Sequence, residues 1–364
     1  MSKTLLTGAS GFIGSHLARK LVERGDDLRL AVPPGGNTEL IDDLGCERAA
    51  CDVLDRRAVR RALAGVGRVF HAAGVTSIDP SDAQRVLEVN VGGTKTVLDE
   101  CLRAGVERVV YTSSAAALGP ASRGGTADET QPFTADRLGI PYVSSVRRAE
   151  LHALRAAAEG LPVVCVNPSV VFGAGDVHLT STKLVRRFLL GRVPVYVDGA
   201  FNVVDVEDVA TGHVLAEESG VVGERYVLAG RNFTFDRLFA DLGRLSGIEP
   251  PVRMPAGLTE ATAALLGTGR FRSPLHPHEV RAASHWWTYS GTKARRELGW
   301  TSRPHEETLE ATVAWHLERE HERMARTRRS QQLQYRFAGA AVGAVEGVAG
   351  LARGMLRRAT AARP

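Results

Sequence analysis

Short apolar runs alternate with segments of helical period through roughly the first 170 residues of this 364-residue chain. The runs read TLLTG, LRLAV, RVFHAAG, RVVYTSS and PVVCVNP, and helical stretches such as HLARKLVER lie between them. Strands that alternate with helices pair in parallel, and the helices then cover both faces of the sheet. The pattern therefore predicts an α/β fold with a doubly wound parallel sheet.

A glycine-rich turn follows the first apolar run. Residues 7–14 read TGASGFIG and stand directly before an amphipathic helical segment. In such a turn the first glycine permits a tight bend, the second lets the backbone approach a pyrophosphate, and the third allows close packing of helix on strand. We predict NAD or NADP binding by this loop, through Gly8, Ser10, Gly11, Phe12, Ile13 and Gly14.

The alternating pattern loosens after Gly173, where later segments are rich in Gly and Pro. We expect a dinucleotide-binding domain at residues 1–173, with late strands of its sheet contributed from about 201–230. Residues 174–318 are expected to form mainly a substrate-binding lobe, and residues 319–364 a basic, Ala/Gly-rich helical tail.

Charge and cysteine usage exclude several classes of protein. Ten Arg and three Glu give residues 319–364 a net charge of +7, so residues 1–318 carry −2 and a nucleic-acid partner is not expected. The four cysteines have no CxxC spacing and no companion His cluster, so we expect neither disulfides nor a metal site. The first residues leave no room for a signal peptide, and we infer a cytoplasmic protein.

The glycine turn and seven further segments, in order, resemble motifs of the extended short-chain dehydrogenase/reductase family. The turn is TGASGFIG, whose spacing is GxxGxxG, and the seven are CDVLD, FHAAG, VNVGGT, YTSSAAALG, NPSVVFGAGD, FNVVDVEDVA and KARRELGW. Within the family the chain is most similar to the branch of dihydroflavonol reductase, 3β-hydroxysteroid dehydrogenase and related epimerases. The resemblance implies further cofactor contacts from Asp52, Val53, Ala72, Ala73, Gly74, Asn90, Asn167 and Val170.

The choice between NAD and NADP depends on the end of the second strand. NAD enzymes of this fold usually have an acidic residue there, and NADP enzymes an arginine nearby. This chain has Pro33 after LRLAV. Because no carboxylate would repel a 2′-phosphate, we favour NADP slightly over NAD.

The resemblance also implies a Ser, Tyr and Lys active site. Family members use the Tyr hydroxyl as acid or base and the Ser hydroxyl to hold the substrate oxygen, while the Lys lowers the Tyr pKa. Ser114 and Tyr142 match the first two, with Ser113 as an alternative that contacts substrate. The lysine position is Val146.

Neither following arginine can replace that lysine on a regular helix. A helix turns about 100° per residue, so Arg147 lies about 140° and Arg148 about 240° round from the tyrosine. A second YxxxK, Tyr289 to Lys293, falls in a stretch assigned to the C-terminal lobe, far from the sheet. We interpret its spacing as coincidental.

Three functions are compatible with this site. The first is an NAD(P)-dependent oxidoreductase that reduces a ketone or oxidises a secondary alcohol of a small organic substrate. The second is a non-redox lyase, isomerase or cyclase that keeps a bound dinucleotide, and the third is a catalytically silent NAD(P)-binding regulatory module. Retention of Ser114 and Tyr142 argues against the third. His178 and Phe201 match substrate-binding positions, and Asp208 is expected to cap the helix that follows it.

The tail has its own pattern. Residues 337–356 contain few charges, and on a helical wheel Glu346, Arg353 and Arg357 oppose an apolar face. This favours a helix at 337–358 lying on an anionic membrane or on a partner, with a mobile extension as the alternative. Besides a small-molecule substrate, a homodimer is left open.

Overall fold

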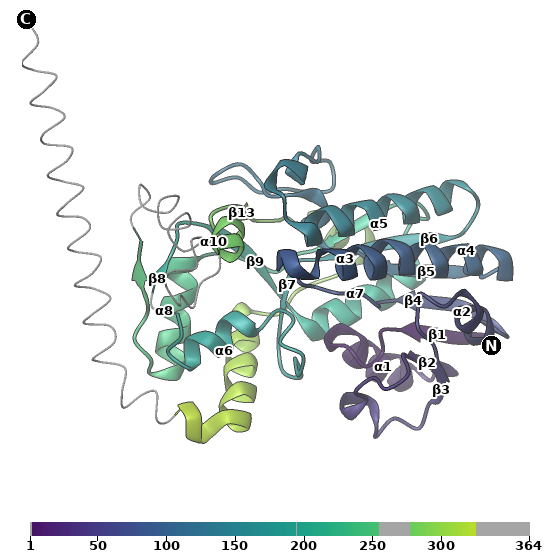
Figure 1. Ribbon diagram of the computed structural model, residues 1–364, viewed down its shortest axis with the longest axis horizontal. Coiled ribbons are helices and arrows are strands. Elements are labelled where there is room, and N and C mark those ends of the chain that lie inside the picture. Colours follow the sequence, from purple (N-terminus) through teal and green to yellow (C-terminus); the bar gives the residue numbers. More distant parts are fainter. Residues whose placement is uncertain (1, 194, 255–276, 325–364) are drawn as a thin grey trace, which may run out of the picture.

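The computed structural model describes residues 2–193, 195–254 and 277–324, and its centre is a seven-stranded parallel sheet (Figure 1). The strands lie in the order β10-β6-β5-β4-β1-β2-β3, and each neighbouring pair is parallel. Their bounds are β1 Lys3–Thr7, β2 Leu28–Val32, β3 Glu47–Ala50, β4 Val66–His71, β5 Arg108–Thr112, β6 Val163–Pro168 and β10 Arg225–Leu228. The predicted doubly wound fold is confirmed.

Helices cover both faces of this sheet (Figure 1). On one face lie α1 (Phe12–Arg24) and α7 (Val206–Ser219), with α11 (Thr292–Leu298) against α7 and β10. On the other lie α2 (Arg56–Ala62), α4 (Thr94–Ala104) and α5 (Pro141–Ala158). The short α3 (Ala83–Leu87) and a π-helical turn, η3 (Glu88–Gly93), lead into α4. The order of strands reverses between β1 and β4, so ligands are expected at the carboxyl ends of these strands.

Local sequence explains where the two helices nearest the site begin and end. In α1 the buried residues Leu17, Ala18 and Leu21 recur at helical spacing and pack on the sheet. The helix ends at Gly25, whose φ of 87° is left-handed and whose N–H bonds carbonyls of the last turn. In α5, Pro141 occupies the first turn, where its missing N–H costs nothing.

A smaller lobe is built on a second sheet. β9 (Ala200–Asp205) pairs with β11 (Arg231–Thr234), β13 (Trp286–Trp287) and β7 (Val170–Phe172), while β8 (Val195–Tyr196) pairs with β12 (Val252–Arg253). The helices α6 (Lys183–Leu189), α8 (Phe235–Ser246) and α10 (Pro277–Ala283) pack around it, and residues 305–324 are also helical. Of the late strands expected from 201–230, β10 joins the main sheet and β9 belongs to this second one.

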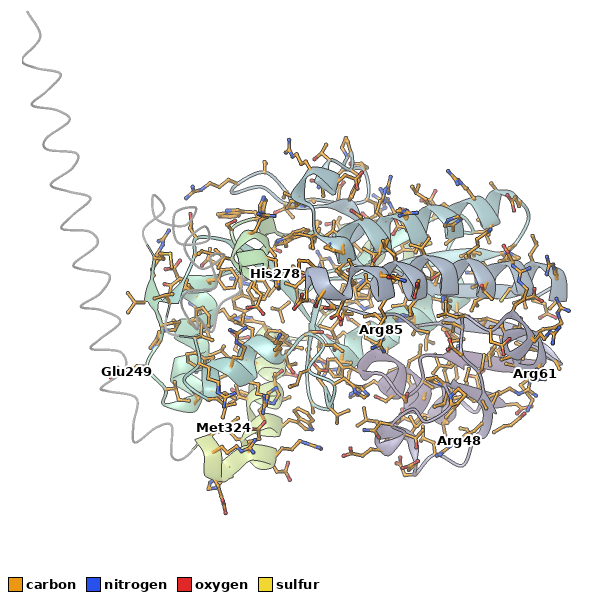
Figure 2. The ribbon with its side chains drawn as sticks, viewed as in Figure 1. Arg48, Arg61, Arg85, Glu249, His278 and Met324 are labelled. Carbon is orange, nitrogen blue, oxygen red and sulfur yellow. The ribbon has the colours of Figure 1, made fainter. Side chains whose placement is uncertain are left out.

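Short 3-10 turns complete the described chain. They are η1 (Glu39–Ile41), η2 (Pro80–Asp82), η4 (Ala115–Leu118) and η5 (Ala135–Leu138). Met324, the last described residue, lies at the lobe end of the molecule, and Arg48 and Arg61 lie at the opposite end (Figure 2). The predicted surface helix at 337–358 falls outside the described residues. Within residues 2–193, 195–254 and 277–324, every helix is too short or too polar to cross a bilayer.

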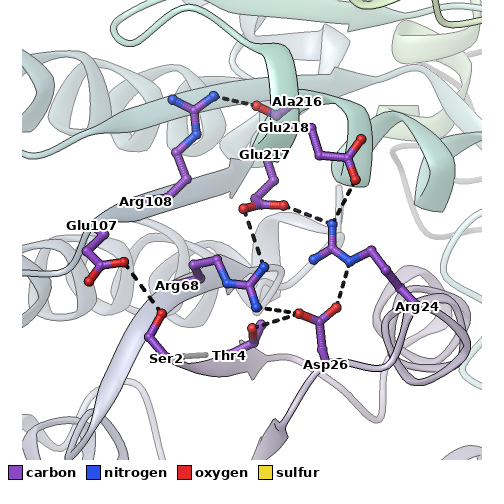
Figure 3. Close-up of polar contacts among 10 residues, drawn as sticks. All are labelled: Ser2, Thr4, Arg24, Asp26, Arg68, Glu107, Arg108, Ala216, Glu217 and Glu218. Carbon is purple, nitrogen blue, oxygen red and sulfur yellow. Dashed lines mark hydrogen bonds and ion pairs between the residues drawn. The ribbon is translucent and has the colours of Figure 1, made fainter.

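A cluster of charges ties the sheet together at the amino ends of its strands (Figure 3). Asp26 accepts from Arg68 at 2.6 Å, from Arg24 at 2.7 Å and from the Thr4 hydroxyl at 3.2 Å. Arg24 also donates to Glu217 of α7 at 2.8 Å. The cluster joins α1, α7 and β4 at the edge opposite the glycine turn, so it stabilises the fold without touching the site.

One predicted cap was wrong. The N-cap of α7 is Asp205, whose carboxylate accepts from the Glu207 N–H at 2.8 Å. Asp208 lies in the first turn and instead accepts from Arg303, through the backbone N–H at 2.7 Å and the guanidinium at 3.0 Å. The helix begins three residues earlier than expected because Asp205 itself ends β9 in an extended conformation.

Candidate active site

The turn between β1 and α1 requires glycine at two of its three positions. Gly8 has a φ of 72°, and a Cβ there would lie 2.6 Å from the backbone of Ala72 and Ala73. A Cβ on Gly14 would lie 2.0 Å from the carbonyl oxygen of Gly8. Gly11 is the N-cap of α1, and because glycine has no side chain it makes no capping hydrogen bond. The N-terminus of α1 is thus left without a capping side chain, and such a helix N-terminus suits a pyrophosphate.

The chain segment after β4 forms the other side of this turn. Ala72 donates its N–H to Thr7 O at 3.1 Å, which holds the Ala72–Gly74 segment against the end of β1. Asn90, in the π-helical turn η3, accepts from the Val75 N–H at 2.8 Å and donates to Val75 O at 2.9 Å. Ala72 and Ala73 therefore lie against the glycine turn, and the Asn90 side chain fixes Val75 two residues further on.

The expected adenine end of the crevice is formed by the segment after β3. Asp52 is exposed, and its carboxylate accepts from the Leu54 N–H at 2.9 Å. Val53 is buried against Gly93, where a Cβ would lie 2.7 Å from the valine side chain. At the end of β2, Pro33 and Pro34 are exposed and uncharged. These residues fit a dinucleotide, and no acidic group stands at the expected ribose position.

Ser114 and Tyr142 are brought together at the carboxyl end of β5. Ser114 is the N-cap of η4, where its Oγ accepts from the Ala116 N–H at 3.2 Å. Tyr142 lies in the first turn of α5, with its hydroxyl near the Ser114 side chain. Burial raises the pKa of Tyr142 above its ordinary value of 10.0, and the Ser114 hydroxyl opposes this. Neither effect comes from a cation, so the hydroxyl stays protonated at neutral pH.

Val146 lies on the buried face of α5, one turn after the tyrosine. The Arg147 side chain contacts other residues: its guanidinium is 5.3 Å from the centre of the Phe133 ring and 3.5 Å from a carboxylate oxygen of Glu150. Arg148 is exposed. On this regular helix the lysine position is therefore apolar, and its arginine neighbours point elsewhere, as the helical geometry predicts.

A buried carboxylate that the sequence analysis missed lies beneath the pair. Glu150 accepts from Ser113 Oγ at 2.7 Å, from Arg225 at 2.8 Å and from the Asn167 side-chain amide. Asn167 also donates to Ser114 O at 3.1 Å. The hydroxyl of Ser113 is thus engaged with Glu150, which leaves Ser114 as the serine beside Tyr142. The signal was an acidic residue on the mainly apolar face of α5.

The second YxxxK does not form an active pair, although its predicted distance from the sheet was wrong. The ammonium of Lys293 is 2.6 Å from a carboxylate oxygen of Glu224 and 3.0 Å from Arg225 O, at the edge strand β10. The Tyr289 hydroxyl donates to Gly119 O at 3.2 Å. Each side chain has its own partners, so the spacing carries no shared chemistry.

An apolar cavity of about 300 Å³ lies between the second sheet and α6, α8 and α10. Phe201 is in its wall, as expected of a substrate-binding residue, and so is Val170, which was expected at the cofactor. His178 is exposed and lies outside the wall. Neither Ser114 nor Tyr142 is in its wall, but Ile78, Ala282 and Trp287 of the wall pack against the same apolar cluster as Tyr142.

A glycine turn at the strand reversal with a Ser–Tyr pair beside it defines a short-chain dehydrogenase/reductase of the extended type. The chain belongs to the NAD dependent epimerase/dehydratase family, whose model matches residues 4–229. The resemblance inferred from the motifs is thereby confirmed.

Three relatives illustrate the range of the family. The sterol demethylase protein B of Methylococcus capsulatus is 34% identical over 87% of this chain and 98% of its own. A Synechocystis protein with the name "Putative dihydroflavonol 4-reductase" is 33% identical over 85% of this chain and 93% of its own. The crystal structure of a nucleoside-diphosphate-sugar epimerase from Pseudomonas aeruginosa is 28% identical, covers 87% of this chain and 98% of its own, and superposes with a TM-score of 0.75.

Proposed function

We propose that the protein is an NAD(P)-dependent oxidoreductase that interconverts a ketone and a secondary alcohol. The observation that carries the proposal is that Ser114 and Tyr142 lie near each other at one end of the sheet. The pair stands at the carboxyl end of β5, on the same edge of the sheet as the glycine turn after β1. Ser114 would hold the substrate oxygen, and Tyr142 would exchange a proton with it.

The cofactor would be held by the backbone of Gly8–Gly14 and by the small residues Ala72–Gly74. The close approach of Gly8 to the Ala72 backbone, which a Cβ would prevent, supports this assignment. When bound, the nicotinamide supplies or accepts the hydride. Because Pro33 brings no carboxylate to the end of β2, we favour NADP over NAD.

The protonation state of Tyr142 favours the reductive direction. A protonated hydroxyl can donate to the oxygen of a carbonyl as that oxygen becomes an alcohol, whereas alcohol oxidation needs the phenolate as base. Burial raises the pKa of Tyr142, and Val146 offers no charge to lower it. We therefore propose that reduction dominates at neutral pH and that oxidation needs alkaline conditions.

The test is whether the dinucleotide is consumed. With NADPH and a ketone substrate, an oxidoreductase causes a stoichiometric loss of nicotinamide absorbance, and deuterium placed on the nicotinamide appears on the carbinol carbon. A lyase, isomerase or cyclase that keeps its cofactor would convert substrate at constant absorbance. Conversion without net oxidation of NADPH would replace the proposal by that non-redox alternative.

A binding control separates the cofactor from the chemistry. Gly11→Asp adds a carboxylate at the N-terminus of α1, where it repels phosphate. NADPH titration followed by nicotinamide fluorescence should saturate for the unchanged protein and be lost in this variant.

A further inference from the structure

The wall of the cavity is almost entirely hydrocarbon. Six aromatic side chains from five elements contribute to it: Phe172, Tyr196, Phe201, Phe235, Phe239 and Trp287. They also pack on one another, since the ring centres of Phe201 and Phe235 are 5.1 Å apart and those of Tyr196 and Phe239 are also 5.1 Å apart. Such walls exclude water and favour apolar ligands by burial of surface.

The cavity and Tyr142 border the same apolar cluster. Ile78, Ala282 and Trp287 belong to the cavity wall. These three side chains, and that of Tyr142, each pack against the cluster of Ala135, Ile140 and Val143. Trp287 therefore borders both the cavity and the cluster against which Tyr142 packs.

The charged groups of the wall are two cations and one carboxylate, and both cations contact that carboxylate. Arg187 lies 2.9 Å and 3.1 Å from the two carboxylate oxygens of Glu279, and Lys183 is 3.5 Å from one of them. The Tyr196 hydroxyl donates to Asp236 at 2.7 Å. Within the described part of the wall, both cations therefore face an acid. A nucleoside diphosphate needs several charge-assisted bonds to its phosphates, and burying one here without them would be strongly unfavourable.

We propose that this cavity, as its described residues form it, binds the apolar body of a neutral carbonyl substrate and not a nucleoside diphosphate. The inference rests on the proposed function for the placement of the substrate oxygen, and it adds the substrate class. Two kinds of neutral ketone have a large apolar body: those with a rigid fused-ring skeleton and those with a flexible alkyl chain.

The experiment measures binding, not turnover. Full-length Tyr142→Phe protein saturated with NADPH is titrated with progesterone, with 2-dodecanone and with UDP-glucose, and heat release is recorded. The inference predicts saturable binding of at least one ketone and none of UDP-glucose. Tighter binding of progesterone would indicate a substrate with a rigid skeleton, and tighter binding of 2-dodecanone a substrate with a flexible chain. Binding of UDP-glucose, or of none of the three ligands, overturns the inference.

A matched pair of variants locates the binding. Phe201 and Phe233 are direct partners across β9 and β11, and both are buried in the same core, but Phe201 alone of the two lines the cavity. Phe201→Ala should weaken ketone binding about tenfold or more, whereas Phe233→Ala should leave it within about twofold at similar cost in stability. Equal effects of the two variants contradict the inference.

A third variant covers the case in which either alanine variant fails to fold. Ala282→Leu adds bulk to the cavity wall beside Trp287 and should weaken ketone binding while NADPH affinity is kept. Unchanged ketone affinity in this variant contradicts the inference. Failure of the proposed function is distinct, because it appears as conversion without NADPH oxidation, whatever the ligand that binds.

Discussion

At the scale of single residues, the protein has the tyrosine of its family's active site, Tyr142, and has a valine where the family's lysine is expected. Val146 is buried one turn after Tyr142, and burial holds the pKa of that tyrosine above its ordinary value. Val146→Lys should bring an ammonium to the same face of α5. A cation close to the phenolate favours it and lowers the tyrosine pKa by about 1–3 units.

The measurement for this variant is the pH dependence of alcohol oxidation. The pH at which the rate of alcohol oxidation begins to rise should be lower in Val146→Lys than in the unchanged protein. Val146→Met, which alters the side chain without adding charge, is the control. Identical pH profiles for the lysine and methionine variants would show that position 146 does not tune Tyr142.

Glu150 is the second residue with a testable role, and that role is positioning. Its carboxylate binds Ser113, Asn167 and Arg225 below the pair. Glu150→Gln leaves Arg225 facing a neutral amide, and breaking a buried ion pair costs about 3–5 kcal/mol. We expect kcat to fall with little change in KM, because Asn167 would no longer be fixed under Ser114.

Glu100→Gln is the matched control for that change. Glu100 is also a buried carboxylate bound by arginines, but it lies on α4 and contacts Arg60 and Arg103. It should alter the urea midpoint and leave kcat unchanged. If both variants reduced kcat alike, Glu150 would have only a general structural effect.

The sequence predicted this site in part. Ser114 and Tyr142 were predicted because they match the serine and tyrosine positions of the family that the chain resembles. Glu150 was missed because its ion-pair partner Arg225 is 75 residues away, on a strand that joins the sheet late in the chain. Local periodicity carries no information on such a contact.

At the scale of elements, the turn between β1 and α1 is the most constrained segment. Gly14→Ala would put a Cβ 2.0 Å from Gly8 O, so the turn must shift. We expect NADPH affinity to fall by about tenfold or more, equal to about 1.4 kcal/mol. Nicotinamide fluorescence measures this directly.

The other end of α1 supplies the control. Gly25 has a φ of 87°, but a Cβ there meets nothing within 4 Å. Gly25→Ala should therefore cost about 1–2 kcal/mol of stability through backbone strain and leave NADPH affinity unchanged. A Gly14→Ala protein with normal affinity would remove the turn from the proposed cofactor site.

The elements of the main sheet were predictable, and those of the lobe were not. Apolar runs such as PVVCVNP identify buried parallel strands without help from the rest of the chain. β8, β12 and β13 are two residues long each and exist through their pairing with distant segments, so no pattern marks them. The cap of α7 was misplaced because Asp205 and Asp208 are equally good capping residues in sequence.

At the scale of the whole molecule, three buried histidines make stability depend on pH. Burial lowers the pKa of His71, His213 and His316 from 6.5 to about 4 in each case. The unfolded chain thus binds more protons than the folded one between these values. Stability is complete above about pH 6.5 and falls as the pH drops towards 4, by about 1.4 kcal/mol per pH unit for each histidine.

His213 is the best position for a test. Its Nδ1 donates to Val209 O at 2.7 Å, and its Nε2 accepts from Thr112 at 2.8 Å, which suits the neutral ring. Urea unfolding at several values between pH 7 and pH 4.5 gives the free energy of unfolding as a function of pH. In His213→Gln the slope of this curve should be smaller than in the unchanged protein by the amount that one proton contributes. An unaltered slope would mean that His213 is not neutral in the folded protein.

The central claim is that Tyr142 is the proton donor for carbonyl reduction, and the direct measurement compares two tyrosine variants. Tyr289 is buried near Tyr142 and hydrogen-bonded to Gly119 O, so Tyr289→Phe is a matched control. A positioned general acid contributes about 10²- to 10⁴-fold. With a ketone that the unchanged protein reduces, kcat for NADPH oxidation should fall by about that factor in Tyr142→Phe and by less than about threefold in Tyr289→Phe. Full turnover by Tyr142→Phe would contradict the account.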